Sequence, residues 1–196
     1  NVPQKDITLV VPSIVHPHVL ELWQNNILFF NKFAPDIPAL VEIQKKVSHI
    51  GILTPGGTVL SVTYDLAFQA GANPIVFVGQ DLSYPKSKSH SHGSEAAGKG
   101  LKFMMDKQKD QLVMETDING KSLRTLKSMA VSKQWFEWAF TNLKRDNPLM
   151  VINSSEAGIL TDHCSLQPLS ETIFKHCAKK LNVSWILKKA LKRKNR

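Results

Sequence analysis

Apolar residues in this chain occur both as continuous runs and at helical spacings. Continuous apolar runs rich in β-branched residues predict buried strands, and such runs lie at residues 7–11, 27–30, 75–78 and 149–152. Apolar residues at intervals of three and four predict helices, over residues 13–24, 39–46, 58–70 and 126–145, with a last helix that begins near Pro168 and runs into the C-terminal tail. Asn119-Gly120, between β-favouring flanks, predicts a hairpin. Strands that alternate with helices predict an α/β fold: a Rossmann-like, doubly wound, mostly parallel sheet with a small β-hairpin insertion.

Two of the predicted helices carry clear signals of how they end and pack. Thr58 is typical of an N-cap residue, and Gly71 of the residue that follows a helix. One apolar stripe is predicted to face the core, and it consists of Val59, Val62, Leu66 and Ala70. Tyr64 and Phe68 lie on the opposite side, and a cover over that side too is the alternative. Aromatic residues at helical spacing predict a second buried face, on the helix over 126–145, and they are Trp135, Phe136 and Trp138.

Polar groups follow two of the predicted strands. Gln80-Asp81 come after the strand at 75–78, and residues 153–156 come after the strand at 149–152. Ligands in open α/β sheets bind beyond the carboxyl ends of the strands. If the two strands are neighbours, these groups line one crevice. Gly56-Gly57-Thr58 offers backbone N–H groups at a helix start, which suit an anion; the alternative is a tight turn followed by an N-cap.

Length and composition set the organisation. A chain of 196 residues with 42% apolar residues suits one α/β domain, predicted over residues 1–180, followed by a basic tail over 181–196. No run of eighteen apolar residues occurs, and the start at Asn1 reads as a mature or trimmed end or as a piece of a longer chain. Cys164 and Cys177 fit no zinc pattern, so reduced thiols and a cytoplasmic setting are predicted.

The positive charge is uneven. The formal net charge is +9, and residues 188–196 contain six Lys or Arg residues. The basicity therefore belongs to the tail, and no nucleic-acid partner is predicted. An aromatic and aliphatic cluster, Trp185-Ile186-Leu187, precedes these cations. Residues 185–196 either make peripheral contact with an anionic membrane or form a solvated end.

Several short segments, taken together, resemble a known family. They are Gly56-Gly57-Thr58-Val59, Asp65-Leu66-Ala67, Gly71, Pro74-Ile75, Val78-Gly79-Gln80-Asp81-Leu82-Ser83-Tyr84, Ser89-His90, Gly93, Thr125, Asn153, Glu156 and Gly158. This pattern, over about residues 50–170, resembles the motility-associated factor proteins, which are flagellin-modifying glycosyltransferases. Their domain is shared with the archaeal 6-hydroxymethylpterin diphosphokinase group.

The resemblance implies a Rossmann-like transferase domain similar to bacterial sialyltransferases. The implied donor is a CMP-linked nonulosonic acid, and the implied acceptor is a protein hydroxyl such as one on flagellin. In the diphosphokinase branch, pyrophosphate moves from ATP with Mg²⁺; no other cofactor is implied. The family's early Gly-x-Gly-Pro-Ser segment is missing, because Val11-Pro12-Ser13 reads as an accidental match. The chain is therefore expected to start partway into the family domain, and a non-catalytic binding module is the third alternative.

The predicted site combines the residues with the resemblance. Asp81 is a candidate general base or Mg²⁺ ligand, His90 a base that titrates near neutrality, and Glu156 an acid or a contact to sugar hydroxyls. The predicted substrate- and nucleotide-binding residues are Gly56, Gly57, Thr58, Asp65, Gln80, Tyr84, Thr125 and Asn153. Each has a structural alternative: a charge at a helix start for Glu156, an N-cap for Thr125, a loop anchor for Tyr84 and a surface ion pair for Asp65 are examples. His90 and His92 lack a third ligand, so no metal site is predicted from the residues alone.

Overall fold

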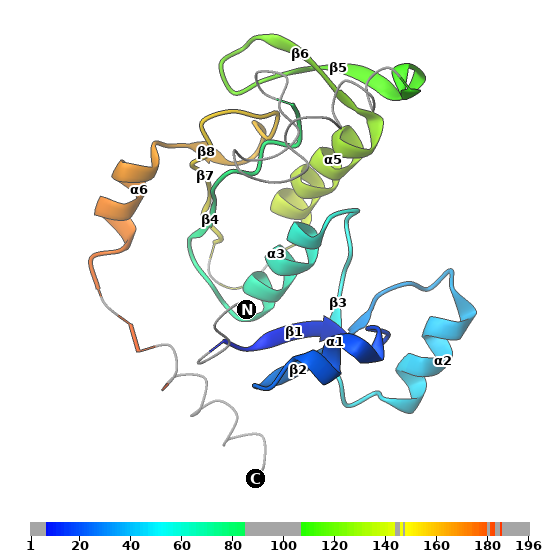
Figure 1. Ribbon diagram of the computed structural model, residues 1–196. Helices are drawn as coiled ribbons and strands as arrows, with labels where there is room; N and C mark the ends of the chain where they lie inside the picture. The colour runs from blue at the N-terminus through cyan, green and yellow to red at the C-terminus, as the bar shows by residue number, and fades with distance from the viewer. Residues whose placement is uncertain are drawn as a thin grey trace. The chain divides into compact units, whose positions relative to one another are not determined.

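The computed structural model describes residues 7–84, 107–143, 146, 148–179, 181, 182 and 185. It divides into two compact units, which are described separately: unit 1 comprises residues 1–55 and 179–196, and unit 2 comprises residues 56–178 (Figure 1). The division predicted from the sequence, with a domain over 1–180 and a tail over 181–196, stays a prediction.

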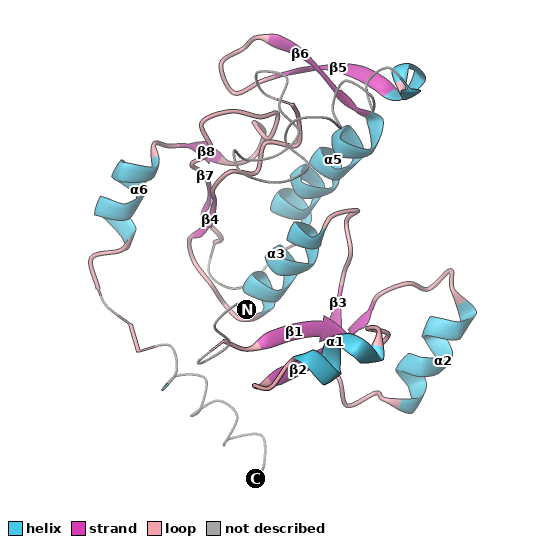
Figure 2. Ribbon diagram, in the orientation of Figure 1, coloured by secondary structure: helices cyan, strands magenta, loops and turns pink. Residues whose placement is uncertain are grey.

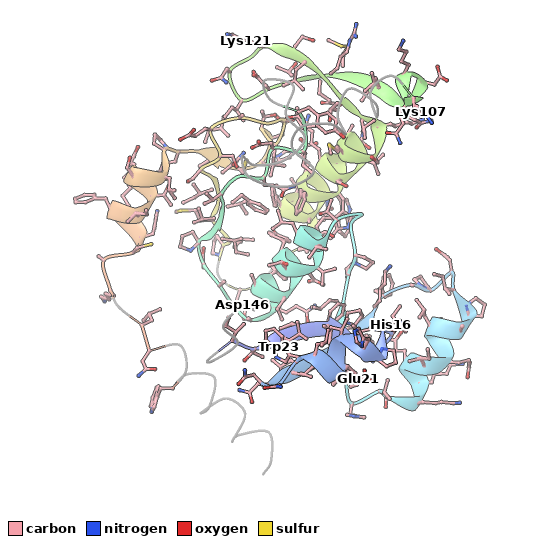
Figure 3. All side chains as sticks on the ribbon, in the orientation of Figure 1. His16, Glu21, Trp23, Lys107, Lys121 and Asp146 are labelled. Carbon is pink, nitrogen blue, oxygen red and sulfur yellow. The ribbon has the colours of Figure 1, made fainter. Side chains whose placement is uncertain are left out.

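Unit 1 contains a small parallel sheet with two helices. Its elements are β1 (Leu9–Pro12), α1 (Pro17–Leu22), β2 (Ile27–Lys32), α2 (Pro38–Lys46) and β3 (Ile52–Leu53). The strand order is β1-β2-β3, and both pairs are parallel. His16 caps α1 through its ring, which accepts a hydrogen bond from the His18 amide (Figure 3). Asn31, which is 2% exposed, donates through its amide to the carbonyls of Val47 and Ile50 and so fixes the end of α2.

Unit 2 contains a parallel sheet, a hairpin and three helices among its described residues. Its elements are α3 (Val59–Gln69), β4 (Ile75–Phe77), the short 3₁₀ helix η3 (Lys109–Gln111), β5 (Leu112–Thr116), β6 (Ser122–Leu126), α5 (Lys127–Asn142), β7 (Val151–Asn153), β8 (Ser165–Leu166) and α6 (Leu169–His176). The parallel sheet has the order β4-β7-β8 (Figure 2). None of the helices in the described ranges has the length and apolarity needed to cross a lipid bilayer.

The α/β class and the parallel strands are confirmed. The described strands form three separate sheets, of which only the β5–β6 pair is antiparallel. A Rossmann-like, doubly wound sheet is therefore not confirmed. The register Phe77↔Asn153 makes β4 and β7 direct neighbours, as the sequence required for a shared crevice.

The predicted hairpin is confirmed at its turn. Asp117 Oδ1 accepts hydrogen bonds from the amides of Asn119 and Lys121, and the Asp117 amide donates to the Lys121 carbonyl. These bonds hold the pKa of Asp117 below its usual range, with the Lys121 amide as the largest cause. The Asx-type turn thus closes β5 onto β6 through local hydrogen bonds, and one distant bond adds to them, from the Ile118 amide to the Gly158 carbonyl at 2.9 Å.

Both ends of α3 are as predicted, but its buried face is not. Thr58 Oγ1 accepts from the Ser61 amide, and the amides of Gly71 and Ala72 bond back to Phe68 and Ala67, which is a Schellman ending. The predicted apolar stripe is wrong: Val59 is 85% exposed and Leu66 is 37% exposed. The opposite side is the buried one, and it carries Ser61, Tyr64 and Asp65.

Tyr64 selects that face because it joins the aromatic core of unit 2. Its ring centroid lies 5.9 Å from that of Phe77, 6.1 Å from that of Phe136 and 5.3 Å from that of Phe140. A large aromatic side chain buries about 150–250 Å² and gains further from contact with other rings, so the side of α3 that carries Tyr64 is the one that faces the core. On α5, Phe136 is fully buried and Trp135 packs against the core, but the prediction for Trp138 is wrong, since Trp138 is 50% exposed.

Candidate functional site

The segments that follow β4 and β7 run side by side and are joined by hydrogen bonds. The Ser154 amide donates to the Phe77 carbonyl (2.8 Å), and the Gln80 amide donates to Ser155 Oγ (3.0 Å). The Ile159 amide donates to the Asp81 carbonyl (2.9 Å). We call residues 79–82 and 154–159 the strand-end junction. It lies at the carboxyl ends of two adjacent parallel strands, where ligands of open α/β sheets bind.

Gly158 lets the two halves of the junction approach closely. A Cβ atom at this position would lie 2.4 Å from the Asp81 carbonyl oxygen and 2.5 Å from its Cα. The φ angle of Gly158 is +111°, which other residues rarely adopt. The sequence pattern marked Gly158 as part of a motif but gave no reason for it; the reason is this contact with the backbone of Asp81.

Asp81 is a partly buried ionisable residue of the junction, and the residue that follows it has a strained backbone. Burial raises the pKa of its carboxyl group. Its neighbours Gly79 and Leu82 have positive φ angles of 68° and 48°. A left-handed conformation at a non-glycine residue costs about 1–3 kcal/mol and persists where the surroundings enforce it, often at functional sites. Here the Leu82 carbonyl is held by Thr125 Oγ1, which donates to it at 2.8 Å.

The polar residues after β7 divide into a buried and an exposed part. Asn153 is 1% exposed, and its amide group is used internally: Nδ2 donates to the Leu160 carbonyl, and Oδ1 accepts from the Ser155 amide. Glu156 is exposed. The alternative reading of Glu156 as a charge at a helix start is wrong, because the described element after β7 is the strand β8. The ligand roles of Asn153 and Glu156 stay predictions.

The glycine turn before α3 is a packed turn. The Gly56 amide, which the sequence suggested was bare, donates to Ser61 Oγ at 2.6 Å. A Cβ on Gly56 would lie 2.1 Å from the Trp135 ring, and Gly57 has a φ of +90°. Thr58 is the N-cap. These contacts account for the two glycines by packing against α5, and the predicted anion-binding role of the turn stays a prediction.

The remaining predicted residues are placed as follows. Asp65 is 4% exposed and accepts from Gln69 Nε2 through both carboxylate oxygens, at 3.1 Å. Tyr84 is 8% exposed, packs with Leu126, and has its pKa raised by burial. Thr125 is fully buried; its alternative role as an N-cap is wrong, because Leu126 is the N-cap of α5. His90 and His92 lie outside the described residues.

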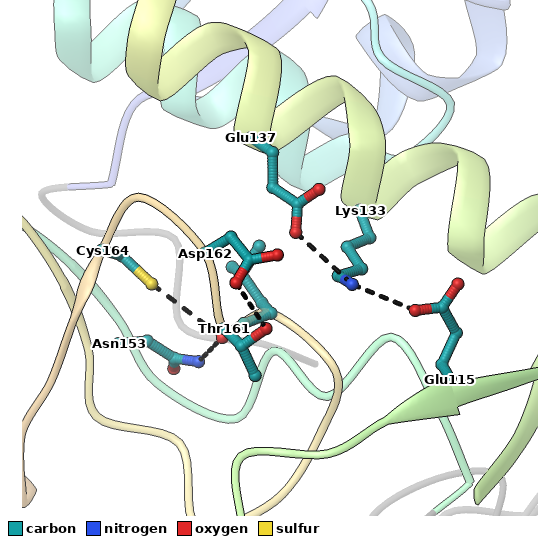
Figure 4. Close-up of polar contacts among 8 residues, drawn as sticks. Glu115, Lys133, Glu137, Asn153, Thr161, Asp162 and Cys164 are labelled. Atoms are coloured by element: carbon teal, nitrogen blue, oxygen red, sulfur yellow. Dashed lines mark hydrogen bonds and ion pairs between the residues drawn. The ribbon is translucent and has the colours of Figure 1, made fainter. Parts of the chain in front are cut away.

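A second set of buried charges, which sequence reasoning missed, joins the hairpin to α5 (Figure 4). Lys133 Nζ lies 3.0 Å from Glu115 Oε2 and 3.5 Å from Glu137 Oε1, with side-chain exposures of 13%, 23% and 18%. We call Glu115, Lys133, Glu137 and the nearby Asp162 the Lys133 cluster. Burial alone would lower the pKa of Lys133, but the hydrogen bond to Glu115 and the adjacent carboxylates raise it overall. Burial, with Asp162 nearby, raises the pKa of Glu137 despite Lys133.

Three junction residues were not among the predicted site residues: Ser154, Ser155 and Leu82. The sequence placed both serines in the polar segment that follows the strand at 149–152 but gave neither a role of its own. The positive φ of Leu82 has no sequence signal, because it results from contacts with Thr125 and the 154–159 segment. No group of three or more His, Cys, Asp or Glu residues that could hold a metal ion occurs within the described ranges.

Comparison with known proteins gives one match. Residues 1–87 match the family model described as 6-hydroxymethylpterin diphosphokinase MptE-like. No curated protein and no solved structure gives a match. The matched range includes the Gly56–Thr58 turn and the segment from Val78 to Tyr84, and it also takes in residues 1–49, which the motif pattern left outside. The later motif residues, from Ser89 to Gly158, lie beyond the matched range. The resemblance to the 6-hydroxymethylpterin diphosphokinase MptE-like family is thus confirmed over residues 1–87 of the chain.

Proposed function

We propose that this chain is a transferase domain that moves a group from a nucleotide-activated donor to a hydroxyl group, with the strand-end junction as its reaction site. The observation that carries the proposal is Asp81: a carboxyl group with a raised pKa, next to the left-handed backbone of Leu82, beyond the carboxyl end of β4 and beside the end of β7. The family match, which covers Asp81, supports a transferase.

Asp81 suits the role of general base. A base works best when its pKa lies near the working pH, and burial moves the pKa of this carboxyl group in that direction. The hydrogen bonds of Gln80 to Ser155 and of Leu82 to Thr125 hold the backbone on both sides of Asp81. A fixed backbone orients the side chain without a cost at the moment of reaction. Glu156, exposed on the neighbouring segment, would contact the donor or the acceptor.

Two finer forms of the reaction follow from the resemblance. In pyrophosphoryl transfer, the acceptor oxygen bonds to the β-phosphorus of ATP, the bond from that phosphorus to the bridging oxygen breaks, and AMP leaves. In nonulosonate transfer, the acceptor oxygen bonds to the anomeric carbon, the bond from that carbon to the phosphate oxygen breaks, and CMP leaves. In both, Asp81 takes the proton of the hydroxyl. The description of the family model supports the first form, and the motif pattern through residue 158 supports the second, with a protein such as flagellin as acceptor.

Mg²⁺ fits the first form only as an ion carried by the donor. Mg²⁺ is usually held by one or two carboxylates together with substrate phosphates. Within the described ranges the junction supplies Asp81 and Glu156 as carboxylates, and no group of three ligands is assembled. When bound, the ion would neutralise phosphate charge.

Nucleotide binding tests the proposal. The midpoint of thermal unfolding should be measured with ATP, CTP and CMP, each with and without Mg²⁺. A nucleotide at 100 times its dissociation constant should raise the midpoint by about 5–10 °C. A rise with ATP and Mg²⁺, with AMP release when 6-hydroxymethylpterin is added, would support pyrophosphoryl transfer; a rise with cytidine nucleotides would support nonulosonate transfer. No rise with any nucleotide would refute the transferase and favour a non-catalytic binding module.

A further inference from the structure

The C-terminal segment, residues 169–196, concentrates the positive charge of the whole chain. Nine of the 25 Lys and Arg residues lie after Glu171, and no Asp or Glu follows it. The remaining 16 Lys and Arg residues equal the 16 Asp and Glu residues in number, so residues 1–174 are neutral in sum. The net charge of +9 therefore belongs entirely to residues 175–196.

The same segment exposes large apolar side chains wherever the structure describes it. On α6, Leu169, Ile173 and Phe174 are 40%, 51% and 84% exposed. Beyond the helix, Leu181 is 67% exposed and Trp185 is 58% exposed. The other side of α6 is held by Thr172, which is 2% exposed and hydrogen-bonds Ser154 through its hydroxyl at 2.9 Å. The exposed apolar side chains of α6 therefore lie away from the contact between Thr172 and Ser154.

We propose that the C-terminal segment binds the surface of an anionic membrane. Exposed aromatic and aliphatic side chains next to a run of cations are typical of segments that lie in a lipid interface, where the apolar groups enter the acyl boundary and the cations face anionic headgroups. A nucleic acid would use the cations and would stack its bases on exposed aromatic rings, but it would offer no apolar partner to the aliphatic Leu169, Ile173 and Leu181. The interleaved apolar residues therefore favour the membrane. This proposal is independent of the proposed transferase activity.

Cosedimentation of the 196-residue chain with vesicles tests the proposal. Binding is expected to vesicles of 70% phosphatidylcholine and 30% phosphatidylglycerol, and only weakly to pure phosphatidylcholine. Each cation near an anionic surface strengthens partitioning roughly fivefold. The variant Lys188→Gln/Lys189→Gln/Lys192→Gln should therefore partition roughly 100-fold less. The matched control is Lys45→Gln/Lys46→Gln/Lys127→Gln, which removes three exposed lysines outside the segment and should bind like the unaltered chain.

The apolar contribution is tested by Phe174→Ser, with Trp138→Ser as the control because Trp138 is also an exposed aromatic side chain. Phe174→Ser should weaken binding by about tenfold or more, and Trp138→Ser should not. Unchanged circular dichroism would show that both variants fold. Equal binding to both vesicle types, no binding to anionic vesicles at low salt, or unaltered binding by Phe174→Ser would each overturn the proposal. Tighter binding to poly(U) than to anionic vesicles at the same salt concentration would also overturn it, because the segment would then be a nucleic-acid-binding segment.

Discussion

The strand-end junction and the Lys133 cluster both bury ionisable side chains, but they treat the charge differently. In the Lys133 cluster, a lysine stands between two carboxylates at 3.0 and 3.5 Å, and its pKa is raised in favour of the charged form. At the junction, burial acts on the carboxyl group of Asp81 and raises its pKa, against the charged form. Partnered charge of the first kind holds elements together. Burial also raises the pKa of Glu137 in the cluster, but there Lys133 lies 3.5 Å away and acts against the shift, whereas burial is the cause of the shift at Asp81. A carboxyl group of the second kind is poised to exchange a proton, which is what a reaction site requires.

The largest expected effect comes from Asp81→Asn. This change keeps the shape of the side chain and removes the base, so transfer should slow by about 10²–10⁴-fold. Asp110→Asn, at an exposed carboxylate on η3, is the matched control and should leave the rate unchanged. The rate is measured as AMP or CMP release with whichever donor binds. Activity of Asp81→Asn within threefold of the unaltered chain would remove Asp81 from catalysis.

Gly158→Ala tests whether the junction must be tightly packed. The new Cβ would overlap the backbone of Asp81, and the positive φ adds strain, so the free energy of unfolding should fall by about 2–4 kcal/mol. Gly120→Ala separates the two causes, because Gly120 has a φ of +75° and open space around its Cβ position. Gly120→Ala should cost only about 1 kcal/mol in urea unfolding. If both variants lose the same free energy of unfolding, the close contact between Gly158 and the backbone of Asp81 contributes nothing to stability.

Lys133→Met should lower the free energy of unfolding at pH 7 by about 1–2 kcal/mol, because Glu115 and Glu137 lose their partner while still reaching some solvent. Lys127→Met, at an exposed position of the same helix, should change the free energy of unfolding by less than about 0.5 kcal/mol.

The stabilisation by Lys133 should also depend on pH. The folded-state pKa of Lys133 is raised, so its contribution to the free energy of unfolding is complete below the unfolded pKa of about 10.4. It should be lost as the pH rises through the folded-state pKa. A loss independent of pH would indicate packing and not charge.

At Asp81 the sign of the pH dependence is reversed relative to a paired carboxylate. Because the folded-state pKa of Asp81 is raised, the folded state holds more protons than the unfolded state between the unfolded pKa of about 3.9 and the higher folded-state pKa. The free energy of unfolding therefore falls as the pH rises through this window. Asp81→Asn should increase the free energy of unfolding at pH 7, by less than Lys133→Met decreases it, and the gain should vanish at pH 3. A loss of stability at pH 7 would mean that the Asp81 carboxylate is paired.

The smallest effect concerns the thiol beside the Lys133 cluster. Burial, with the charges of Asp162 and Glu137, raises the pKa of Cys164 to about 11, whereas Cys177 is exposed. At pH 8 about 0.1% of such a thiol is ionised, and the thiolate is the reactive form. Iodoacetamide should therefore label Cys177 first. Cys164 should react at least about 100-fold more slowly, as measured by mass spectrometry of the labelled peptides. Equal labelling would contradict the arrangement around Cys164.

Local signals in the sequence predicted local structure well. Thr58, Gly71 and the Asn119-Gly120 turn act through neighbours within five residues, so their roles could be derived without a fold. The adjacency of β4 and β7 was a condition of the predicted crevice, and the structure meets this condition. The predictions that failed depended on distant partners. The buried face of α3 is chosen by Phe77, Phe136 and Phe140, and periodicity alone could not weigh them against the aliphatic stripe.

The candidate site shows the same limit. Residue type identified Asp81 and the polar residues after β7. It could not show that Asn153 donates to the Leu160 carbonyl and that Thr125 donates to the Leu82 carbonyl, because these hydrogen bonds exist only once the chain is folded. The Lys133 cluster brings together residues 18 positions apart across the hairpin. No spacing rule for helices or strands predicts that pair, since it follows from how the hairpin folds over α5.

The central claim is that a nucleotide-activated donor binds at the strand-end junction. It is tested most directly by ¹⁵N NMR titration of the chain with ATP and Mg²⁺ and, separately, with CMP. The account predicts saturable shifts of the backbone amides of Gly79, Gln80, Asp81, Ser154 and Ser155 with at least one of the nucleotides. Saturable shifts confined to other residues, with these amides unmoved, would contradict it.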